Sequence, residues 1–140
     1  MEPHEIVKLG LSLVPEGRQI FPSLTVLENL LIGSYCRAVR KFRQTALDGV
    51  FSLFPILKGR IKQTGTDLSG GEQQMLAIGR ALMSSPRMII FDEISLGLSP
   101  VVIKELYEAV RRINHEGTAV ILVEQGVKRS LKFSDFAYIL

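Results

Sequence analysis

Two short segments carry the residues that could do chemistry, and both suit a bound phosphate. The run LSGGEQQ at residues 68–74 places two glycines directly after Ser69, and glycine lets backbone N–H groups approach a ligand closely. Ser69 and Glu72 have the S-x-x-E spacing of a capping box, so the run predicts a helix start, which is a ready anion site. The run MIIFDE at residues 88–93 predicts a buried strand ending in two carboxylates. Acids at the carboxyl end of such a strand suit a metal-bound phosphate.

These two runs and their spacing resemble the ATP-binding subunits of ABC transporters, with LSGGEQQ as the signature motif and MIIFDE as the Walker B strand. Other runs are similar to the branch of the family that imports branched-chain amino acids: VPEGR at 14–18, LTVLENL at 24–30, SLGLSP at 95–100 and LVEQ at 122–125. The resemblance covers nearly every residue. It implies an α/β fold, a partial RecA-like P-loop NTPase domain of the ABC type with a helical (signature) subdomain.

The same resemblance divides the chain into two parts. Residues from about 22 to 75 would form the helical subdomain, and residues from about 10 to 21 and 76 to 140 would form part of the RecA-like core. No G-x-x-x-x-G-K-[ST] loop, the Walker A element that cradles phosphates, occurs in the sequence. We therefore expect an incomplete domain that lacks its first strands and Walker A, is truncated at both ends and is inactive alone.

Roles for individual residues follow from the resemblance. Asp92 would bind Mg²⁺ through water, and Glu93 would orient and deprotonate the water that attacks ATP. The residues expected to contact an ATP molecule held by a partner subunit are Ser69, Gly70, Gly71 and Glu72. An acid pair after a strand can merely cap a turn, and a glycine-rich helix start can bind nothing, but two runs of this length favour the nucleotide. We also expect Gly71→Asp to abolish hydrolysis while leaving the fold intact.

Two further candidates depart from the common pattern of the superfamily. Glu16 stands where most members have a glutamine that touches magnesium, and it keeps an oxygen ligand for a hard cation. Gln125 stands where most have a switch histidine. A glutamine can donate and accept a hydrogen bond but does not titrate near neutral pH, so any sensing of the γ-phosphate would be insensitive to pH.

Composition sets the expected compartment and partners. The longest apolar runs are too short to span a bilayer, one cysteine, Cys36, allows no internal disulfide, and no signal sequence begins the chain. We expect a cytoplasmic protein, peripheral on the inner face of the cell membrane. The implied partners are a second ABC ATPase subunit, transmembrane permease subunits that dock near Glu16, Phe21, Leu24 and Tyr35, and indirectly a substrate-binding protein.

The net charge of +3 is modest, and its densest cluster is Arg37, Arg40, Lys41 and Arg43. Such a cluster can indicate nucleic acid or anionic lipid. We interpret it as a solvated helix face, because no aromatic platform interleaves the basic residues, and we expect no nucleic-acid partner. The alternatives to a transport ATPase are a non-enzymatic fragment or signature-presenting interaction module, and an ABC ATPase that acts on DNA or ribosomes.

The elements that must position these residues follow from periodicity and punctuation. Strands are predicted at residues 11–14, 88–91, 119–123 and 136–140. Helices are predicted from Thr25 to about Tyr35, over 41–54 with Pro55 ending the helix, over 69–83, from Ser99 to just before Gly117, and over 127–132. Strands that alternate with helices imply a parallel sheet.

Overall fold

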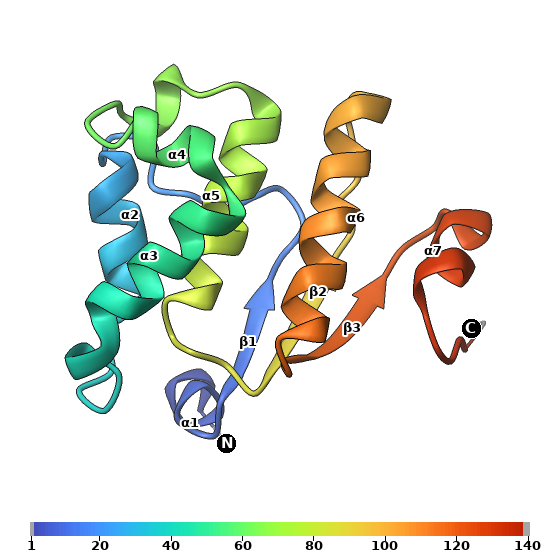
Figure 1. The fold of residues 1–140 in the computed structure, drawn as a ribbon, viewed down its shortest axis with the longest axis horizontal. Coiled ribbons are helices and arrows are strands. Elements are labelled where there is room, and N and C mark those ends of the chain that lie inside the picture. Colours follow the sequence, from blue (N-terminus) through green and yellow to red (C-terminus); the bar gives the residue numbers. More distant parts are fainter. Residues whose placement is uncertain (1, 139–140) are drawn as a thin grey trace.

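Three short parallel strands form the sheet of the computed structural model, which describes residues 2–138. They are β1 (Leu11–Val14), β2 (Met88–Asp92) and β3 (Ala119–Val123), in the order β1-β2-β3. Val14 lies beside Phe91, and Phe91 lies beside Leu122. The predicted parallel sheet is confirmed, and the register brings the carboxyl ends of all three strands to one edge (Figure 1).

Helices pack beside and across this sheet. The segment between β1 and β2 holds α2 (Val26–Gly33), the 3₁₀ turn η1 (Arg40–Phe42), α3 (Arg43–Leu53), α4 (Pro55–Gly59), the 3₁₀ turn η2 (Gly65–Asp67) and α5 (Gly70–Leu82). Outside it lie α1 (Pro3–Lys8), α6 (Pro100–His115) and α7 (Val127–Phe133). Figure 1 shows the helices α2 to α5 gathered on the side of β1, with α6 lying across the sheet and α7 beyond β3.

Predicted helix starts are confirmed where the sequence offers a side-chain cap. Thr25 caps α2 and Ser69 caps α5, each through a capping box that a glutamate completes three residues later. The backbone N–H of Thr25, and then its hydroxyl, hold the pKa of Glu28 below its usual value. Ser99 caps α6, with Pro100 in the first turn. These caps satisfy N–H groups that have no partner inside a helix.

The structure corrects two predicted boundaries and adds a helix. The expected helix over 41–54 is a 3₁₀ turn followed by α3, and Pro55 does not simply end it but begins α4, since proline suits the first turn of a helix. Helix α1 was not predicted, although Glu2 and Glu5 form a capping box at its start.

The predicted strand at 136–140 is wrong over residues 136–138, which the structure describes as irregular, and residues 139–140 lie outside the described part. Phe136 and Tyr138 are 87% and 92% exposed. No other strand of residues 2–138 pairs with the outer edge of β3. An extended segment without a neighbour gains no ladder hydrogen bonds, so apolar character alone does not produce a strand here.

Helices cover one face of the sheet but leave the other face partly exposed. One face buries Val14, Ile89 and Phe91 against α5 and α6, which contribute the fully buried Leu76, Ile78 and Leu106. On the other face Leu13, Ile121 and Val123 are 54%, 43% and 48% exposed. We call these three side chains the open sheet face. No helix within the described residues is long and apolar enough to cross a membrane.

Candidate functional site

The carboxyl edge of the sheet brings together four residues that the sequence singled out. Asp92 is the last residue of β2 and Glu93 follows it, while Glu16 comes two residues after β1 and Gln125 two residues after β3. Since the strands are parallel and in register, all four lie at the same end of the sheet. This is the edge at which α/β sheets hold their ligands.

The start of α5 lies at the same end, because α5 runs antiparallel to β1. At the far end, the Oγ atoms of Ser12 and Ser84 lie 2.7 Å apart. At the near end, Nη1 of Arg18 donates to Oε1 of Gln73 at 3.3 Å. The glycine-rich helix start and the carboxylates of β2 therefore occupy one side of the molecule, as the resemblance implied (Figure 1).

Ser69 and Glu72 are committed to the cap of α5. Oγ of Ser69 accepts from the Glu72 N–H at 3.3 Å, and the Ser69 N–H donates to Oε2 of Glu72 at 2.8 Å. The other carboxylate oxygen of Glu72 pairs with Nε of Arg60 at 3.0 Å. The Glu72 carboxylate thus fixes the helix start. Within residues 2–138 the hydrogen of the exposed Ser69 hydroxyl and the N–H groups of Gly70 and Gly71 have no hydrogen-bond acceptor, so these groups are the ones that a ligand could use.

The two glycines of the helix start differ in their surroundings. A Cβ atom at Gly71 would lie 2.7 Å from Cγ1 of Val102, so this glycine allows α5 to pack closely against α6. A Cβ atom at Gly70 would lie 3.0 Å from the guanidinium of Arg18, a flexible group. An aspartate at Gly71 would have to displace Val102, which argues against the expectation that Gly71→Asp leaves the fold intact.

The backbone at the acids is held in an unusual conformation. Glu93 has a φ of 50°, in the left-handed region that non-glycine residues rarely adopt. Its N–H donates to the Val123 carbonyl at 2.9 Å, which extends the β2–β3 pairing by one residue. Arg18 and Gln19, with φ of 67° and 47°, are also left-handed. Ser85, beyond the other end of α5, has a φ of 50° as well, so three of the four left-handed non-glycine residues of the described chain lie near the carboxyl end of the sheet.

The carboxylates of Asp92 and Glu93 are half-buried, and neither accepts a hydrogen bond from a group in residues 2–138. No cluster of three or more acids, histidines or cysteines within the described chain could by itself hold a metal ion. Mg²⁺ is bound through one or two carboxylates together with water and phosphate oxygens. Glu16 and Asp92 thus offer, at this end of the sheet, carboxylate oxygens of the kind that Mg²⁺ prefers.

The structure adds a residue that the sequence analysis passed over. Ser95 Oγ donates to Oε2 of Glu124 at 2.9 Å, and the Ser95 N–H donates to Oε1 at 3.3 Å. Glu124 thereby joins the loop after Glu93 to the residue before Gln125. The sequence offered one indication of this role, because Glu124 directly precedes Gln125 at the end of a predicted strand.

Two further side chains hold the segment that carries Glu16 and Phe21. Nη2 of Arg80 donates to the Gln19 carbonyl at 2.6 Å, and its guanidinium lies 5.3 Å from the centre of the Phe21 ring. Burial lowers the pKa of Arg80, although an arginine stays charged at neutral pH. The fully buried Asn29 accepts from the Phe21 N–H and donates to the Phe21 carbonyl, both at 2.9 Å. These contacts fasten the segment to α5 and α2.

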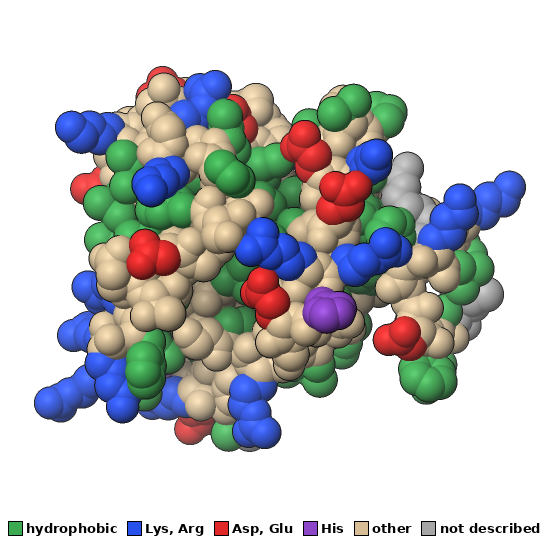
Figure 2. Space-filling view, viewed as in Figure 1, with side chains coloured by type: hydrophobic (Ala, Val, Ile, Leu, Met, Phe, Trp, Pro, Cys, Tyr) green, Lys and Arg blue, Asp and Glu red, His purple; other side chains and the backbone are tan. Residues whose placement is uncertain are grey.

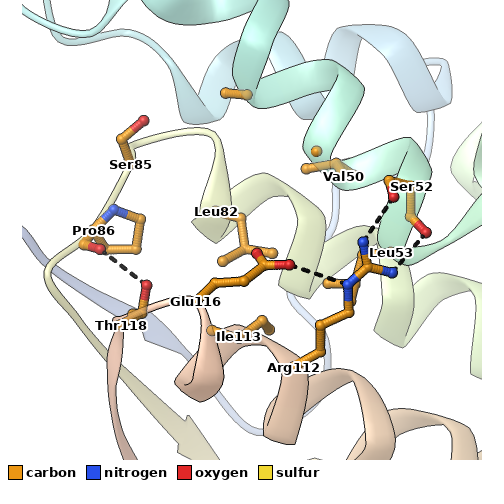
Figure 3. Close-up of a pocket in the computed structure, with 12 residues that line it drawn as sticks. Val50, Ser52, Leu53, Leu82, Ser85, Pro86, Arg112, Ile113, Glu116 and Thr118 are labelled. Carbon is orange, nitrogen blue, oxygen red and sulfur yellow. Dashed lines mark hydrogen bonds and ion pairs between the residues drawn. The ribbon is translucent and has the colours of Figure 1, made fainter.

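A hollow of about 360 Å³ lies elsewhere, between α3 and α6, and none of the predicted site residues lines it (Figure 3). Arg112 occupies one wall, where its Nη2 donates to Oγ of Ser52 at 2.8 Å and its Nε pairs with Glu116 at 3.1 Å. Its guanidinium is already satisfied by these groups, so the hollow does not compete with the sheet edge as the candidate site.

The parallel sheet, its acidic carboxyl edge and the capped helix start define a class of ligand-binding α/β domains. Within that class the chain belongs to the ABC transporter family, whose sequence profile matches residues 2–95. The family and fold that the sequence predicted are thus confirmed.

Among curated relatives, the chain is 47% identical over 135 residues to BraG of Pseudomonas aeruginosa, a high-affinity branched-chain amino acid transport ATP-binding protein. It is 34% identical over 141 residues to LivF of Archaeoglobus fulgidus, a probable protein of the same kind. The alignments cover 96% and 100% of this chain but 58% and 59% of the relatives. The chain therefore spans less than two thirds of their length.

Among solved structures, the ADP conformation of an ATP-binding cassette of an ABC transporter superposes with a TM-score of 0.82 at 26% identity. A nucleotide-free cassette superposes with a TM-score of 0.80 at 26% identity, and each covers 96% of this chain and 58% of the other. The partial α/β cassette is thus shown by fold as well as by sequence.

Proposed function

We propose that the chain is the signature-bearing part of an ATP-hydrolysing subunit that energises the import of branched-chain amino acids. The names of BraG and LivF support this transport role, and the ADP-bound cassette supports a nucleotide ligand. The proposal keeps the division into a helical subdomain at about 22–75 and a RecA-like part at about 10–21 and 76–140. It places the protein at the inner face of the cytoplasmic membrane.

The sheet edge would act on a nucleotide bound with Mg²⁺, which neutralises phosphate charge as the terminal phosphoanhydride bond is cleaved. Asp92 would hold the Mg²⁺ ion through water, as the acceptor of hydrogen bonds. Glu93 orients the attacking water and takes its proton. Gln125 donates its amide N–H to a terminal phosphate oxygen, and Glu16 offers a further oxygen on the metal side.

The first turn of α5 would serve a second ATPase subunit. Ser69, with the N–H groups of Gly70 and Gly71, faces outward from the helix start and suits the γ-phosphate of an ATP molecule held across the dimer interface. Glu72 supports this contact through the cap. The complete site is then shared between two subunits, and each subunit contributes a signature to its partner.

A surface near Glu16 would dock the permease. Phe21 and Tyr35 are roughly half exposed, and Arg80 and Asn29 hold Phe21 in place. Leu24 is half-buried, so it would offer a permease less of its side chain than Phe21 and Tyr35 do. The permease would in turn meet a substrate-binding protein on the other side of the membrane.

One observation supports the proposal most strongly. Asp92, Glu93 and Gln125 lie together at the carboxyl end of the sheet, and the start of α5 lies at the same end. The test is single-turnover ATP hydrolysis by a subunit that contains this chain and a phosphate loop, assembled with its partner. Glu93→Gln should lower the hydrolysis rate about 10²- to 10⁴-fold while ATP stays bound. The control is Glu105→Gln on the exposed side of α6, which should hydrolyse normally. Normal turnover by Glu93→Gln would remove Glu93 from the role of base.

A second candidate is a non-enzymatic module that only presents its signature to a partner, and the lack of a G-x-x-x-x-G-K-[ST] run in the sequence favours it. Reading the DNA upstream of the Met1 codon separates the two functions. An in-frame phosphate-loop run within some tens of codons supports the ATPase, and a stop codon supports the module.

A further inference from the structure

The positive charge of the chain is concentrated in one short stretch. Residues 29–47 contain Arg37, Arg40, Lys41 and Arg43 and no acid. The other 13 basic residues are outnumbered by the 14 acidic ones, so this stretch accounts for the whole net charge of +3. The stretch covers the end of α2, the turn η1 and the first five residues of α3.

Apolar side chains lie exposed among these basic ones. Phe42 is 52% and Tyr35 is 47% exposed, and Ile32 is also exposed. Nζ of Lys41 lies 4.8 Å from the centre of the Phe42 ring. The expectation that no aromatic platform interleaves the basic residues does not hold at Phe42, whose ring lies beside Lys41. Figure 2 shows Lys and Arg side chains gathered at the lower left, where Figure 1 places the start of α3.

The charges in this region are not neutralised by the protein. Within residues 2–138, no acid lies within 4 Å of Arg37, Arg40 or Lys41. Arg43 donates from Nε to the uncharged Oγ of Ser34 at 2.9 Å. A partner with negative charge would neutralise these side chains, which the described residues do not.

We propose that this basic–aromatic patch, formed by Ile32, Arg37, Arg40, Lys41 and Phe42, binds the anionic phospholipid headgroups of a membrane surface. The basic side chains would meet lipid phosphates, while the exposed Phe42 ring and Ile32 would enter the boundary between headgroups and acyl chains. The inference goes beyond the proposed ATPase, because it needs neither nucleotide nor permease.

A lipid surface fits the patch better than a nucleic acid does. An exposed isoleucine gains contact in the headgroup region but none on a phosphate backbone. Outside residues 29–47 the 13 basic residues are balanced by 14 acidic ones, so a long polyanion that extended past the patch would gain no further net attraction.

The expected effect is large enough to measure. Each basic residue near an anionic bilayer surface raises the partition coefficient of a protein between water and the bilayer about fivefold. Removing the charges of Arg37, Arg40 and Lys41 together should therefore weaken vesicle binding roughly a hundredfold.

The experiment is co-sedimentation of the 140-residue chain with vesicles of phosphatidylcholine, alone or mixed with about one third phosphatidylglycerol. Binding should require the anionic lipid and weaken when salt screens the charges. The variant R37Q/R40Q/K41Q should lose this binding. Lys41→Gln alone should lower the affinity for the anionic vesicles about fivefold. Phe42→Ser should weaken the binding that remains at high salt, with circular dichroism confirming that each variant is folded.

The matched control is K58Q/K62Q/K128Q, which removes the same charge from exposed lysines outside the patch and should bind almost as the parent does. Equal loss in this control, or equal binding to neutral vesicles through the open sheet face, would overturn the proposal. So would binding of single-stranded DNA through the patch without binding of vesicles. None of these outcomes tests the proposed role of Glu93 in ATP hydrolysis, because the vesicle experiment contains no nucleotide.

Discussion

Glu93 combines a predictable residue type with an unpredictable backbone. Its place after an apolar strand, beside Asp92, followed from the run MIIFDE. Its left-handed φ of 50° did not, because glutamate has no intrinsic preference for that region. Such a conformation costs about 1–3 kcal/mol and persists only when neighbours impose it. Here the hydrogen bond to the Val123 carbonyl does so, and that contact depends on tertiary structure.

Glu124 is expected to act by positioning the loop that follows Glu93. Glu124→Ala removes both hydrogen bonds to Ser95, each of which a charged acceptor makes worth about 1.5–3 kcal/mol. In the assembled ATPase we expect kcat to fall about tenfold or more with little change in the KM for ATP. Glu124→Gln, which keeps one acceptor oxygen, should recover part of the rate. A purely structural role would instead lower the melting temperature and leave kcat of the folded enzyme unchanged.

The adjacent glycines give a matched pair for a stability experiment. Gly71→Ala forces a methyl group against Val102 and should lower the free energy of unfolding by about 1–3 kcal/mol, the usual range for overpacking. Gly70→Ala displaces only the Arg18 head and should cost far less. Urea denaturation of both variants measures the difference. Equal stability would mean that α5 and α6 can separate without cost.

At the scale of elements, the sequence predicted the starts of helices better than their ends. Thr25, Ser69 and Ser99 each supply a side-chain oxygen to the first turn, which is a local interaction that spacing alone reveals. Pro55 was misjudged because proline both ends one helix and begins another. The strand at 136–140 was predicted from its apolar character, but strand formation depends on a neighbour that local sequence does not specify.

Asn29 should be the polar residue on which the segment from Phe21 to Thr25 most depends. Its side chain is fully buried and bonds both the N–H and the carbonyl of Phe21, as well as the Thr25 carbonyl. Asn29→Ala leaves the Phe21 N–H without a partner, while the Phe21 and Thr25 carbonyls keep their backbone bonds to the N–H groups of Leu24 and residue 29. The substitution should lower the free energy of unfolding by about 1–3 kcal/mol. The control is Gln44→Ala, which breaks one exposed bond to Asp48 and should cost below about 0.5 kcal/mol. Equal urea midpoints would contradict this role.

At the scale of the whole molecule, the parallel sheet and the location of the candidate site at its carboxyl edge were predictable. Alternating strands and helices fix both, since parallel strands end together. The unequal cover of the two faces was not predictable from local patterns. Strand β3 is apolar throughout, as in a sheet covered on both sides, yet Ile121 and Val123 are exposed in the structure.

The open sheet face should make the chain self-associate. Exposed apolar strand residues favour contact between molecules, so Leu13→Thr with Ile121→Thr should shift the chain toward monomer. Threonine has the β-branched shape that strands prefer. The control is Val101→Thr, which removes an exposed valine on α6 instead. Light scattering after gel filtration measures the mass, and an unchanged distribution would exclude the open sheet face as the contact.

The central place of β2 also governs how the fold opens. Strand β2 is the one strand of the described sheet with a neighbour on both sides, and its Ile89 and Phe91 are fully buried. Its amide protons should therefore exchange with deuterium last, through global unfolding, while those at the outer edges of β1 and β3 exchange through local opening. Asp92 ends this strand, so the acid proposed to hold the metal is attached to the segment that survives every partial unfolding of the chain.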